Sequence, residues 1–344
     1  MANKLLAYSG ITAKVKAMES NLLKKEDYVK ISNLESIPEF INFLRLNPTY
    51  EQLFSGFEDN ALHRGQIEHL IINSLYDCYG RIYLFCNQEQ RHALTFLSFR
   101  FETNIIKYCL QHVFNEEYEY KGSNFDAYFS KRLNVNLEVL STAKNIDEFI
   151  TCLKDTEYYP ILKAIQNSNC ATLFDYEMQL DIYYFKKVWK LKDKYLKGDS
   201  NKAYTEILGK KIDLLNILWI YRSKKYYDID ASKIYSYIIP IFYKLKKKEI
   251  TALIECNSVD ELKSLLATSY YMKIYGITEI NSFESLYKTV LTKIYKANKQ
   301  KYPNSLAPVQ QFLYLKEIEI DNLTTVLECI RYKLQPNETL SYIQ

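Results

Sequence analysis

The chain repeats one short pattern three times, and this repetition constrains its fold more than any other feature. In each copy a small polar residue precedes an aliphatic residue, Pro or Asp, Glu, and then Phe or Leu; the copies occupy residues 36–40, 145–149 and 258–262. Their glutamates lie 109 and 113 residues apart. This spacing is the size of a domain, not of a short solenoid repeat. About ten positions after each glutamate stand the tyrosines Tyr50, Tyr158-Tyr159 and Tyr270-Tyr271.

The chemistry of each copy predicts the start of a helix. Ser36, Asn145 and Ser258 carry side chains that accept a backbone N–H at a helix N-cap. The glutamate three residues later stands where a capping box places a carboxylate. Apolar residues then recur at three- and four-residue steps, so each copy predicts a short helix with one buried face. Capping explains the three glutamates completely, and we assign them no other role.

A second element recurs with similar spacing. It reads Phe101-Glu102, Ile212-Asp213 and Ile320-Asp321, and each pair opens a long stretch with helical apolar periodicity. The chain therefore predicts three copies of one unit of roughly 110 residues, the size of a single domain. We place three similar helical domains over residues 1–120, 121–230 and 231–344.

The glycine and proline content favours an all-α fold. Only eight glycines and seven prolines are spread over 344 residues, so the residues that punctuate strands and turns are scarce. The 32 tyrosines favour strands by propensity, yet they recur at three- and four-residue steps instead of alternating. We therefore expect helices with half-buried tyrosines whose hydroxyls reach water.

No membrane-spanning or secretory segment is predicted. Runs without a charge, such as residues 214–221 and 234–243, are shorter than the roughly twenty residues that a spanning helix needs. The first six residues are not followed by the apolar core of a signal peptide. The seven cysteines form no C-x-x-C motif, so we expect reduced, mostly buried thiols of a cytoplasmic protein.

The sequence shows no pattern of catalytic, nucleotide-binding or metal-binding residues. The glycines are too far apart for a phosphate-binding loop, and Gly209, which precedes two lysines, is interpreted as a helix boundary. The four histidines include no H-x-x-x-H pair and no cysteine at zinc-finger spacing. A pair such as Cys109 and His112 has no local support as a nucleophile and base. We predict no catalytic residue, cofactor, metal ion or small-molecule substrate.

Two lysine-rich segments raise the question of nucleic-acid binding. Six lysines interleave with aromatic residues over residues 183–197. Phe185, Val188 and Trp189 fall at helical spacing, so we expect the aromatic residues in a buried stripe and the lysines in solvent. A second run lies at residues 244–248, and the net charge of the chain is only +4. We predict no nucleic-acid binding; the lysine-rich faces remain available to an acidic partner or anionic head groups.

The C-terminal copy of the second element resembles part of a known family. Residues 316–331 read KEIEIDNLTTVLECIR. This segment resembles the E-x-E-x-x-N-[LI] helix of the stalk adapter of rotary V/A-type ATPases, called the C subunit in bacteria and archaea and the d subunit in eukaryotes. Residues 8–23 are similar to that family's opening helix, in which a tyrosine precedes an A-[RK]-[VI]-[RK]-A-[ML] run. Asp27-Tyr28, the Glu39-Phe40 block and the D-x-x-N segment at residues 213–216 fit as well, so the resemblance spans the chain.

This resemblance implies a mechanical part of a rotary motor and not an enzyme. Members of the family fold as three similar helical domains arranged as a funnel. The cavity of the funnel takes the end of the central shaft, made by the D and F subunits, and the opposite face sits on the cytoplasmic side of the membrane rotor ring. The chain is accordingly expected to be a peripheral, non-catalytic subunit that couples shaft to ring for ATP-driven H+ or Na+ transport.

Three carboxylates of the recurring helices are candidates for partner contacts. Glu102, Asp213 and Asp321 are expected either to line the cavity and meet basic groups of the shaft, or to cap and pair within their own helices. Both interpretations suit carboxylates near the start of an apolar-periodic stretch.

Four basic residues complete the set of candidate interface residues. Arg222 and Arg331 follow Asp213 and Asp321 by nine and ten residues, whereas the first copy has no arginine at that place. The copies are therefore not in strict register. Lys246 and Lys247 belong to the second lysine run.

Functions of other classes remain open beside the stalk adapter. One is an α-helical scaffold that binds an unrelated protein, and another is an enzyme whose site residues are scattered along the sequence. Repeats of helical scaffolds run about 20 to 45 residues, less than half the unit found here. Unit length therefore favours the adapter over the scaffold.

Overall fold

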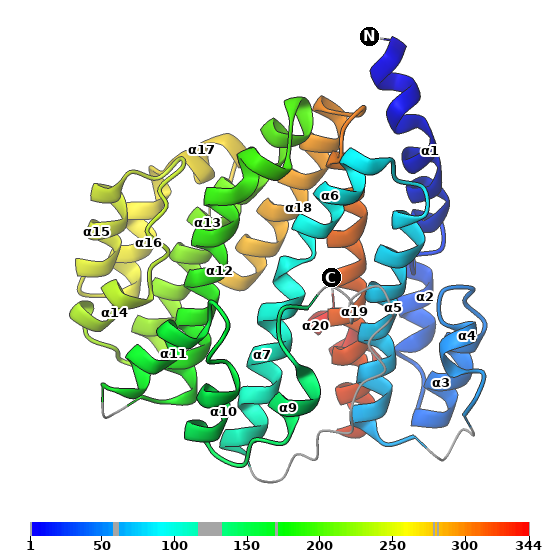
Figure 1. Ribbon diagram of the computed structural model, residues 1–344, viewed down its shortest axis with the longest axis horizontal. Helices are drawn as coiled ribbons and strands as arrows, with labels where there is room; N and C mark the ends of the chain where they lie inside the picture. Colours follow the sequence, from blue (N-terminus) through cyan, green and yellow to red (C-terminus); the bar gives the residue numbers. More distant parts are fainter. Residues whose placement is uncertain are drawn as a thin grey trace. The chain divides into compact units, whose positions relative to one another are not determined.

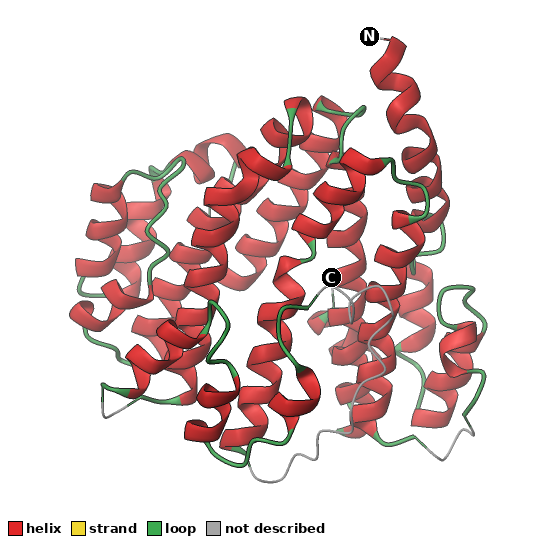
Figure 2. Cartoon of the chain, in the orientation of Figure 1, coloured by secondary structure: helices red, strands yellow, loops and turns green. Residues whose placement is uncertain are grey.

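In a computed structural model of the chain, every regular element of the described residues is a helix (Figure 2). The structure describes residues 2–57, 62–115, 133–168, 171–277, 279–280 and 282–343. The prediction of an all-α fold is confirmed. The helices are α1 (Ala2–Glu19), α2 (Lys25–Ile31), α3 (Ile37–Arg45), α4 (Glu51–Phe54), α5 (Arg64–Tyr83), α6 (Gln88–Leu97), α7 (Phe99–Phe114), α9 (Leu137–Ser141), α10 (Ile146–Cys152), α11 (Tyr159–Gln166), α12 (Leu173–Tyr195), α13 (Gly198–Tyr226), α14 (Ala231–Tyr237), α15 (Lys247–Glu255), α16 (Val259–Ala267), α17 (Tyr270–Tyr275), α18 (Phe283–Lys301), α19 (Ala307–Arg331) and α20 (Pro336–Tyr342).

The helices group into two compact units. Unit 1 contains residues 2–57, 62–94, 133 and 308–343, and so holds α1 to α5, most of α6 and α19, and α20. Unit 2 contains residues 95–115 and the described part of 134–307, with α7 and α9 to α18. The first and last helices of the chain therefore belong to the same unit. The division into three domains at residues 120 and 230 remains a prediction.

The three short helices α3, α10 and α16 begin where the repeated block predicts. At each start the N-cap side chain accepts the backbone N–H of the glutamate three residues later. Each glutamate in turn accepts the backbone N–H of the residue just before the N-cap, one position earlier than in a standard capping box. The glutamate bonds are Glu39 with Glu35 at 3.0 Å, Glu148 with Lys144 at 2.9 Å and Glu261 with Asn257 at 2.8 Å. The capping role is confirmed.

Long helices form the frame of unit 2 (Figure 1). α12 packs on α7 and α13, and α13 packs along α18. On α12, Phe185 and Val188 are buried and Trp189 is half-buried, whereas Lys186 and Lys190 are exposed. The interpretation of this segment as a buried aromatic stripe with a lysine face is confirmed in part, because Lys187 and Lys192 are half-buried.

Gly209 lies inside α13, so its interpretation as a helix boundary is wrong. A Cβ atom at this position would stand 2.4 Å from Cγ of Tyr243. The Tyr243 ring therefore packs directly on the helix backbone and leaves room only for glycine. This contact offsets the roughly 1 kcal/mol that glycine costs in a helix interior relative to alanine.

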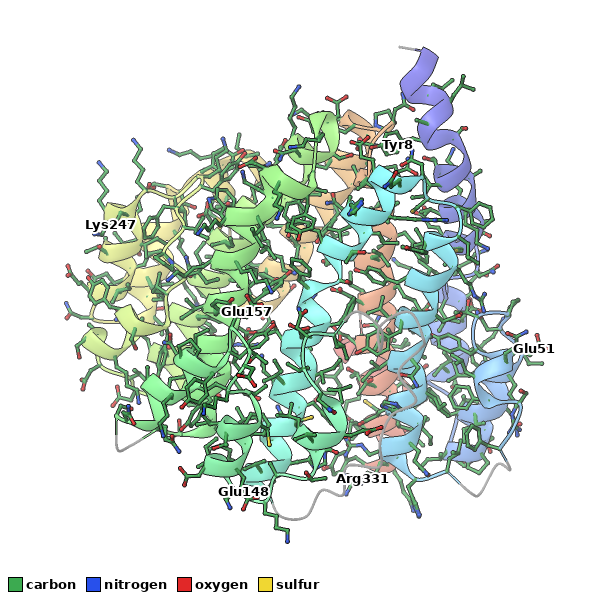
Figure 3. All side chains as sticks on the ribbon, in the orientation of Figure 1. Tyr8, Glu51, Glu148, Glu157, Lys247 and Arg331 are labelled. Carbon is green, nitrogen blue, oxygen red and sulfur yellow. The ribbon has the colours of Figure 1, made fainter. Side chains whose placement is uncertain are left out.

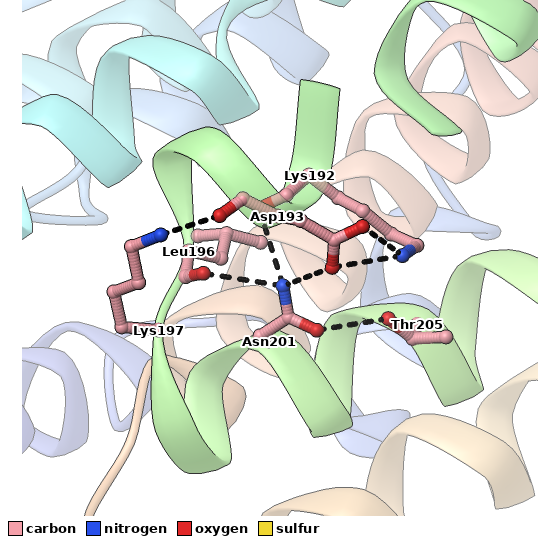
Figure 4. A network of polar contacts seen from close by, with 6 residues as sticks. All are labelled: Lys192, Asp193, Leu196, Lys197, Asn201 and Thr205. Carbon is pink, nitrogen blue, oxygen red and sulfur yellow. Dashed lines mark hydrogen bonds and ion pairs between the residues drawn. The ribbon is translucent and has the colours of Figure 1, made fainter. Parts of the chain in front are cut away.

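Asn201 closes the turn between α12 and α13 (Figure 4). Its Nδ2 atom lies 3.1 Å from the carbonyl oxygen of Leu196, 3.3 Å from that of Lys192 and 2.9 Å from Oδ1 of Asp193. Its Oδ1 atom accepts the hydroxyl of Thr205 at 3.3 Å. One side chain thus ties the last turn of α12 to the first turns of α13.

Two further sequence predictions concern membranes and cysteines. Within the described ranges, no helix combines the length and apolarity needed to cross a bilayer. Of the described cysteines, Cys152 is exposed and the others are buried free thiols, as predicted. Cys170 lies outside the described residues.

Candidate functional site

Glu102, in the first turn of α7, is a buried carboxylate held by groups far along the chain. One of its oxygens accepts the hydroxyl of Tyr158 at 2.8 Å. The other accepts the backbone N–H of Asn134 at 2.6 Å. The helix that follows one copy of the repeated block is thereby joined to the tyrosine that follows the next copy.

Asp213, in the middle of α13, has the same kind of surroundings. Its side chain is 0% exposed and accepts the hydroxyl of Tyr271 at 2.8 Å. Three successive backbone N–H groups, of Tyr243, Lys244 and Leu245, donate to it at 3.1, 2.6 and 3.1 Å. Four donors thus surround one carboxylate and compensate in part for its removal from water. Burial still raises the pKa of Asp213 above its ordinary value.

Glu319, on α19 in unit 1, is the third carboxylate of this kind. It accepts the hydroxyl of Tyr50 at 2.7 Å and the backbone N–H of Leu23 at 2.6 Å. Lys316, whose side chain is 0% exposed, donates to both Glu319 and the Tyr50 hydroxyl at 2.7 Å. A buried ion pair is tolerated only with good geometry and additional hydrogen bonds, and this one has both.

The three tyrosines stay protonated, and so remain hydrogen-bond donors, because each is buried beside a carboxylate. Burial raises the pKa of Tyr50, Tyr158 and Tyr271 far above the ordinary value of a phenol. The neighbouring carboxylates raise it further, since a phenolate beside a carboxylate is unfavourable. We call these contacts the three carboxylate–tyrosine contacts: Glu102–Tyr158, Asp213–Tyr271 and Glu319–Tyr50.

A lysine accompanies each contact, although in different ways. Lys316 stands three residues before Glu319 and pairs with it. Lys210 stands three residues before Asp213 but pairs with Glu206 at 2.9 Å. The corresponding position before Glu102 is Phe99, and there Lys187 of α12 supplies the charge. Its Nζ atom lies 4.5 Å from the centre of the Phe99 ring and is paired with Glu157, which is labelled in Figure 3.

Comparison with known proteins identifies the family. Residues 11–342 match the family model described as ATP synthase (C/AC39) subunit. The chain belongs to this family. The C subunit of the A-type ATP synthase of Methanococcoides burtonii is 25% identical over 334 residues, which cover 93% of this chain and 89% of that protein. The corresponding C subunit of Archaeoglobus fulgidus is 25% identical over 347 residues, covering 97% and 95%. The family predicted from the sequence motifs, that of the V/A-type C subunits, is confirmed.

Of the motifs that resemble the C/AC39 family, those near the two ends of the chain contact each other in unit 1. Glu319 is the second glutamate of the E-x-E segment, and Asn322, three residues later, is linked to Tyr28 by a side-chain hydrogen bond. In the D-x-x-N segment, Asn216 exchanges two hydrogen bonds of 3.0 Å with the backbone of Ile239. These polar residues therefore fix connections between segments distant in sequence.

The carboxylates named from sequence occupy different environments in this C/AC39 chain. Glu102 and Asp213 are buried and fully engaged, which favours pairing within the protein over contact with a partner. Asp321 is exposed on α19. In unit 1 the position that corresponds to Glu102 and Asp213 is taken by Glu319. The sequence instead indicated Asp321, two residues later. The E-x-E spacing and the recurring tyrosines were the signals that could have found Glu319.

The basic candidates all lie at the surface. Arg222 pairs with Glu284 at 3.1 Å, and Arg331 lies 3.9 Å from Glu328. Lys246 and Lys247 are exposed at the start of α15. Figure 3 shows Lys247 on α15 in unit 2 and Arg331 at the end of α19 in unit 1. Their role as partner contacts remains a prediction.

The described part of the chain also carries side chains that bind metal ions or act as nucleophiles in other proteins. It contains no group of three His, Cys, Asp or Glu side chains that could hold a metal ion. Burial raises the pKa of Cys78 and Cys86 to about 11 and that of Cys109 to about 12. These thiols stay protonated at neutral pH and are poor nucleophiles. The buried polar residues described above instead connect helices to one another.

Proposed function

We propose that this chain is a non-catalytic central-stalk subunit of a V/A-type ATPase. It would couple the rotating shaft, made of the D and F subunits, to the membrane rotor ring for ATP-driven H+ or Na+ transport. The observation that carries the proposal is the match to proteins named as C subunits of A-type ATP synthases over more than nine tenths of the chain. In this role the protein would lie peripherally at the cytoplasmic face of the membrane.

A coupling subunit must transmit torque without deforming, and the buried contacts suit that demand. Each carboxylate–tyrosine contact joins a long helix to a segment at least 56 residues away in the chain. Buried, fully satisfied polar groups rigidify a packed interior because breaking them exposes unpaired charge. They support the proposal of a stiff helical body.

We also propose an internal threefold repeat of similar domains, over residues 1–120, 121–230 and 231–344, arranged as a funnel with a central cavity. The three capped helices and the three carboxylate–tyrosine contacts support this arrangement. Glu102 and Asp213 each reach a tyrosine of the following copy, and Glu319 of the third copy reaches Tyr50 of the first. Three copies connected in this cyclic order suit a closed body around a cavity.

The exposed charged residues are the proposed contacts to shaft and ring. They are Arg222, Asp321, Arg331, Lys246 and Lys247. Glu102 and Asp213 are proposed to act indirectly, by holding the helices that carry these residues.

Affinity capture from native membranes tests the proposed function. The tagged full-length chain would be isolated from detergent-solubilised membranes of its source, and the co-purifying proteins identified by mass spectrometry. Recovery of ATPase shaft and ring subunits is the expected result. If a folded, helical bait recovers none of them, the stalk role is wrong and a helical scaffold for an unrelated partner takes its place.

A further inference from the structure

One end of the long helices in unit 2 concentrates positive charge. Residues 190–202, at the end of α12 and the start of α13, contain five lysines and two aspartates. Residues 296–301, at the end of α18, contain three lysines and no acidic residue. The excess of six positive charges is larger than the net charge of +4 of the whole chain. We call this the basic end.

Contacts between α13 and α18 show that these segments share one end of unit 2 (Figure 1). The backbone N–H of Leu306, just after α18, donates to Oγ of Ser200 in the first turn of α13 at 3.0 Å. Lys301, the last residue of α18, pairs with Glu206 of α13 at 3.0 Å. These three helix ends therefore lie together, and their lysines are concentrated at one end of unit 2.

The acidic residues of the basic end are already paired. Asp193 lies 2.9 Å from Lys192, and Asp199 lies 3.6 Å from Lys202. A binding partner would therefore meet an excess of ammonium groups. The exposed lysines of this surface are Lys190, Lys194, Lys197, Lys202, Lys296 and Lys301.

The basic end is also held rigid. Asn201 fixes the turn between α12 and α13 through the bonds drawn in Figure 4. Lys194 and Lys301 lie over the rings of Tyr195 and Tyr302, with Nζ 5.6 and 5.0 Å from the ring centres. Lysines on a fixed frame lose less conformational freedom when they bind a surface of matching charge.

We propose that the basic end binds an acidic polypeptide surface on a partner subunit. The inference rests on the proposed function for the existence of a subunit partner, and it adds the chemistry of the contact. A polypeptide fits better than a membrane because residues 190–202 and 296–306, all of which the structure describes, include no large apolar side chain that is exposed. Peripheral segments that enter a bilayer interface combine cations with exposed apolar residues.

A charge-reversal variant with a matched control tests this inference. The variant K190E/K194E/K296E removes three exposed lysines of the basic end and leaves the bonds of Asn201 untouched. The control K144E/K154E/K273E makes the same change of charge at exposed positions elsewhere in unit 2. Circular dichroism and thermal unfolding would establish that all three proteins are folded.

Direct binding is measured with poly-L-glutamate and with vesicles of equal parts phosphatidylserine and phosphatidylcholine. The wild type and the control are expected to bind poly-L-glutamate with similar affinity, which falls as salt is added. The basic-end variant is expected to bind about tenfold more weakly. Equal binding by variant and wild type overturns the inference. So does a wild type that prefers the vesicles and a variant that loses only vesicle binding, because the surface would then recognise lipid.

Capture from solubilised membranes separates this inference from the proposed function. If the wild type recovers ATPase subunits, the basic-end variant should release them at lower salt than the control does. Equal salt resistance contradicts the inference and leaves the stalk role standing. If the wild type recovers no ATPase subunit, the proposed function fails, and the poly-L-glutamate measurement still decides whether the basic end recognises an acidic polypeptide.

Discussion

The hydroxyl of Tyr50 lies 2.7 Å from a carboxylate oxygen of Glu319, which stands 269 residues further along the chain. Lys316 completes a triangle with these two groups, because its Nζ atom is 2.7 Å from each. The same Nζ atom lies 4.1 Å from the centre of the Tyr50 ring. All three side chains are buried, so the hydrogen bonds and charges of the other two must offset the cost of removing each polar group from water.

Replacing Tyr50 by phenylalanine is expected to lower the free energy of unfolding by about 1–3 kcal/mol, because it leaves a buried carboxylate and ammonium short of one partner. Chemical denaturation of the purified chain measures the change. Tyr332→Phe serves as the control, since that tyrosine is 66% exposed and its substitution should have no measurable effect. Equal stability of the Tyr50→Phe variant and the wild type would show that the hydroxyl does not fasten Glu319.

Removing Lys316 should be more damaging than removing the tyrosine hydroxyl. Lys316→Met leaves the Glu319 charge buried without its counter-charge, and we expect a loss of about 3–5 kcal/mol. The double variant Lys316→Met/Glu319→Gln removes both charges and should recover part of that loss. A double-mutant cycle in denaturant gives the coupling energy; additive effects of the two substitutions would contradict the buried ion pair.

The sequence predicted the helix starts well because their signals are local. An N-cap, a glutamate three residues later and apolar residues at three- and four-residue steps are all local signals, and together they were enough to predict α3, α10 and α16. The partners of the recurring tyrosines were not predictable in the same way. On α19, Glu319 and Asp321 are carboxylates only two residues apart, and packing against a tyrosine 269 residues away decides which one is buried.

Gly209 illustrates the same limit of local reasoning. By propensity a glycine marks the end of a helix, whereas its place inside α13 follows from the ring of Tyr243, a contact that the sequence does not reveal. Exposed charge showed a related pattern. The lysine-rich segment at residues 183–197 was evident from the sequence, but its grouping with the start of α13 and the end of α18 required the structure.

Gly209→Ala is expected to destabilise the protein by about 1–3 kcal/mol, since the new methyl group would overlap the Tyr243 ring and force it away. Tyr243 also donates its N–H to Asp213, so the displacement would disturb that carboxylate as well. Gly65→Ala in α5 is the matched control, because a Cβ there meets nothing within 4 Å. The control should gain up to about 1 kcal/mol from helix propensity. Similar effects at both positions would show that Tyr243 does not restrict Gly209.

The pH dependence of stability should report on Glu206. Burial raises the pKa of this carboxyl, but the bonds from Lys210 and Lys301 outweigh burial and bring it below the ordinary value of 4.5. Because the folded-state pKa is the lower one, the contribution of Glu206 is present above the unfolded pKa and is lost as pH falls through the folded pKa. The difference in unfolding free energy between the wild type and Glu206→Gln should therefore shrink from near-neutral pH to about pH 3.

Glu51→Gln, at an exposed position of α4 labelled in Figure 3, is the control for this titration. Chemical denaturation over the same range of pH measures both variants against the wild type. A Glu206→Gln difference that is constant with pH would mean that the two lysines do not stabilise the carboxylate.

Two residues with left-handed backbone give opposite predictions. Lys333 has φ of 54° at the end of α19, where the N–H groups of Leu334 and Lys333 donate to Cys329 and Ile330 in the pattern that ends many helices with glycine. Lys333→Gly removes the steric penalty of a side chain in this conformation and should raise the free energy of unfolding by about 0.5–1 kcal/mol.

Gly276, with φ of 63° at the end of α17, is the reciprocal case. A Cβ at this position meets nothing within 4 Å, so any effect of Gly276→Ala must come from the backbone. We expect a loss of about 1 kcal/mol. Urea unfolding of the two variants measures both changes in the free energy of unfolding. The two changes must have opposite signs, because Lys333→Gly removes a side chain from a left-handed conformation and Gly276→Ala adds one to it.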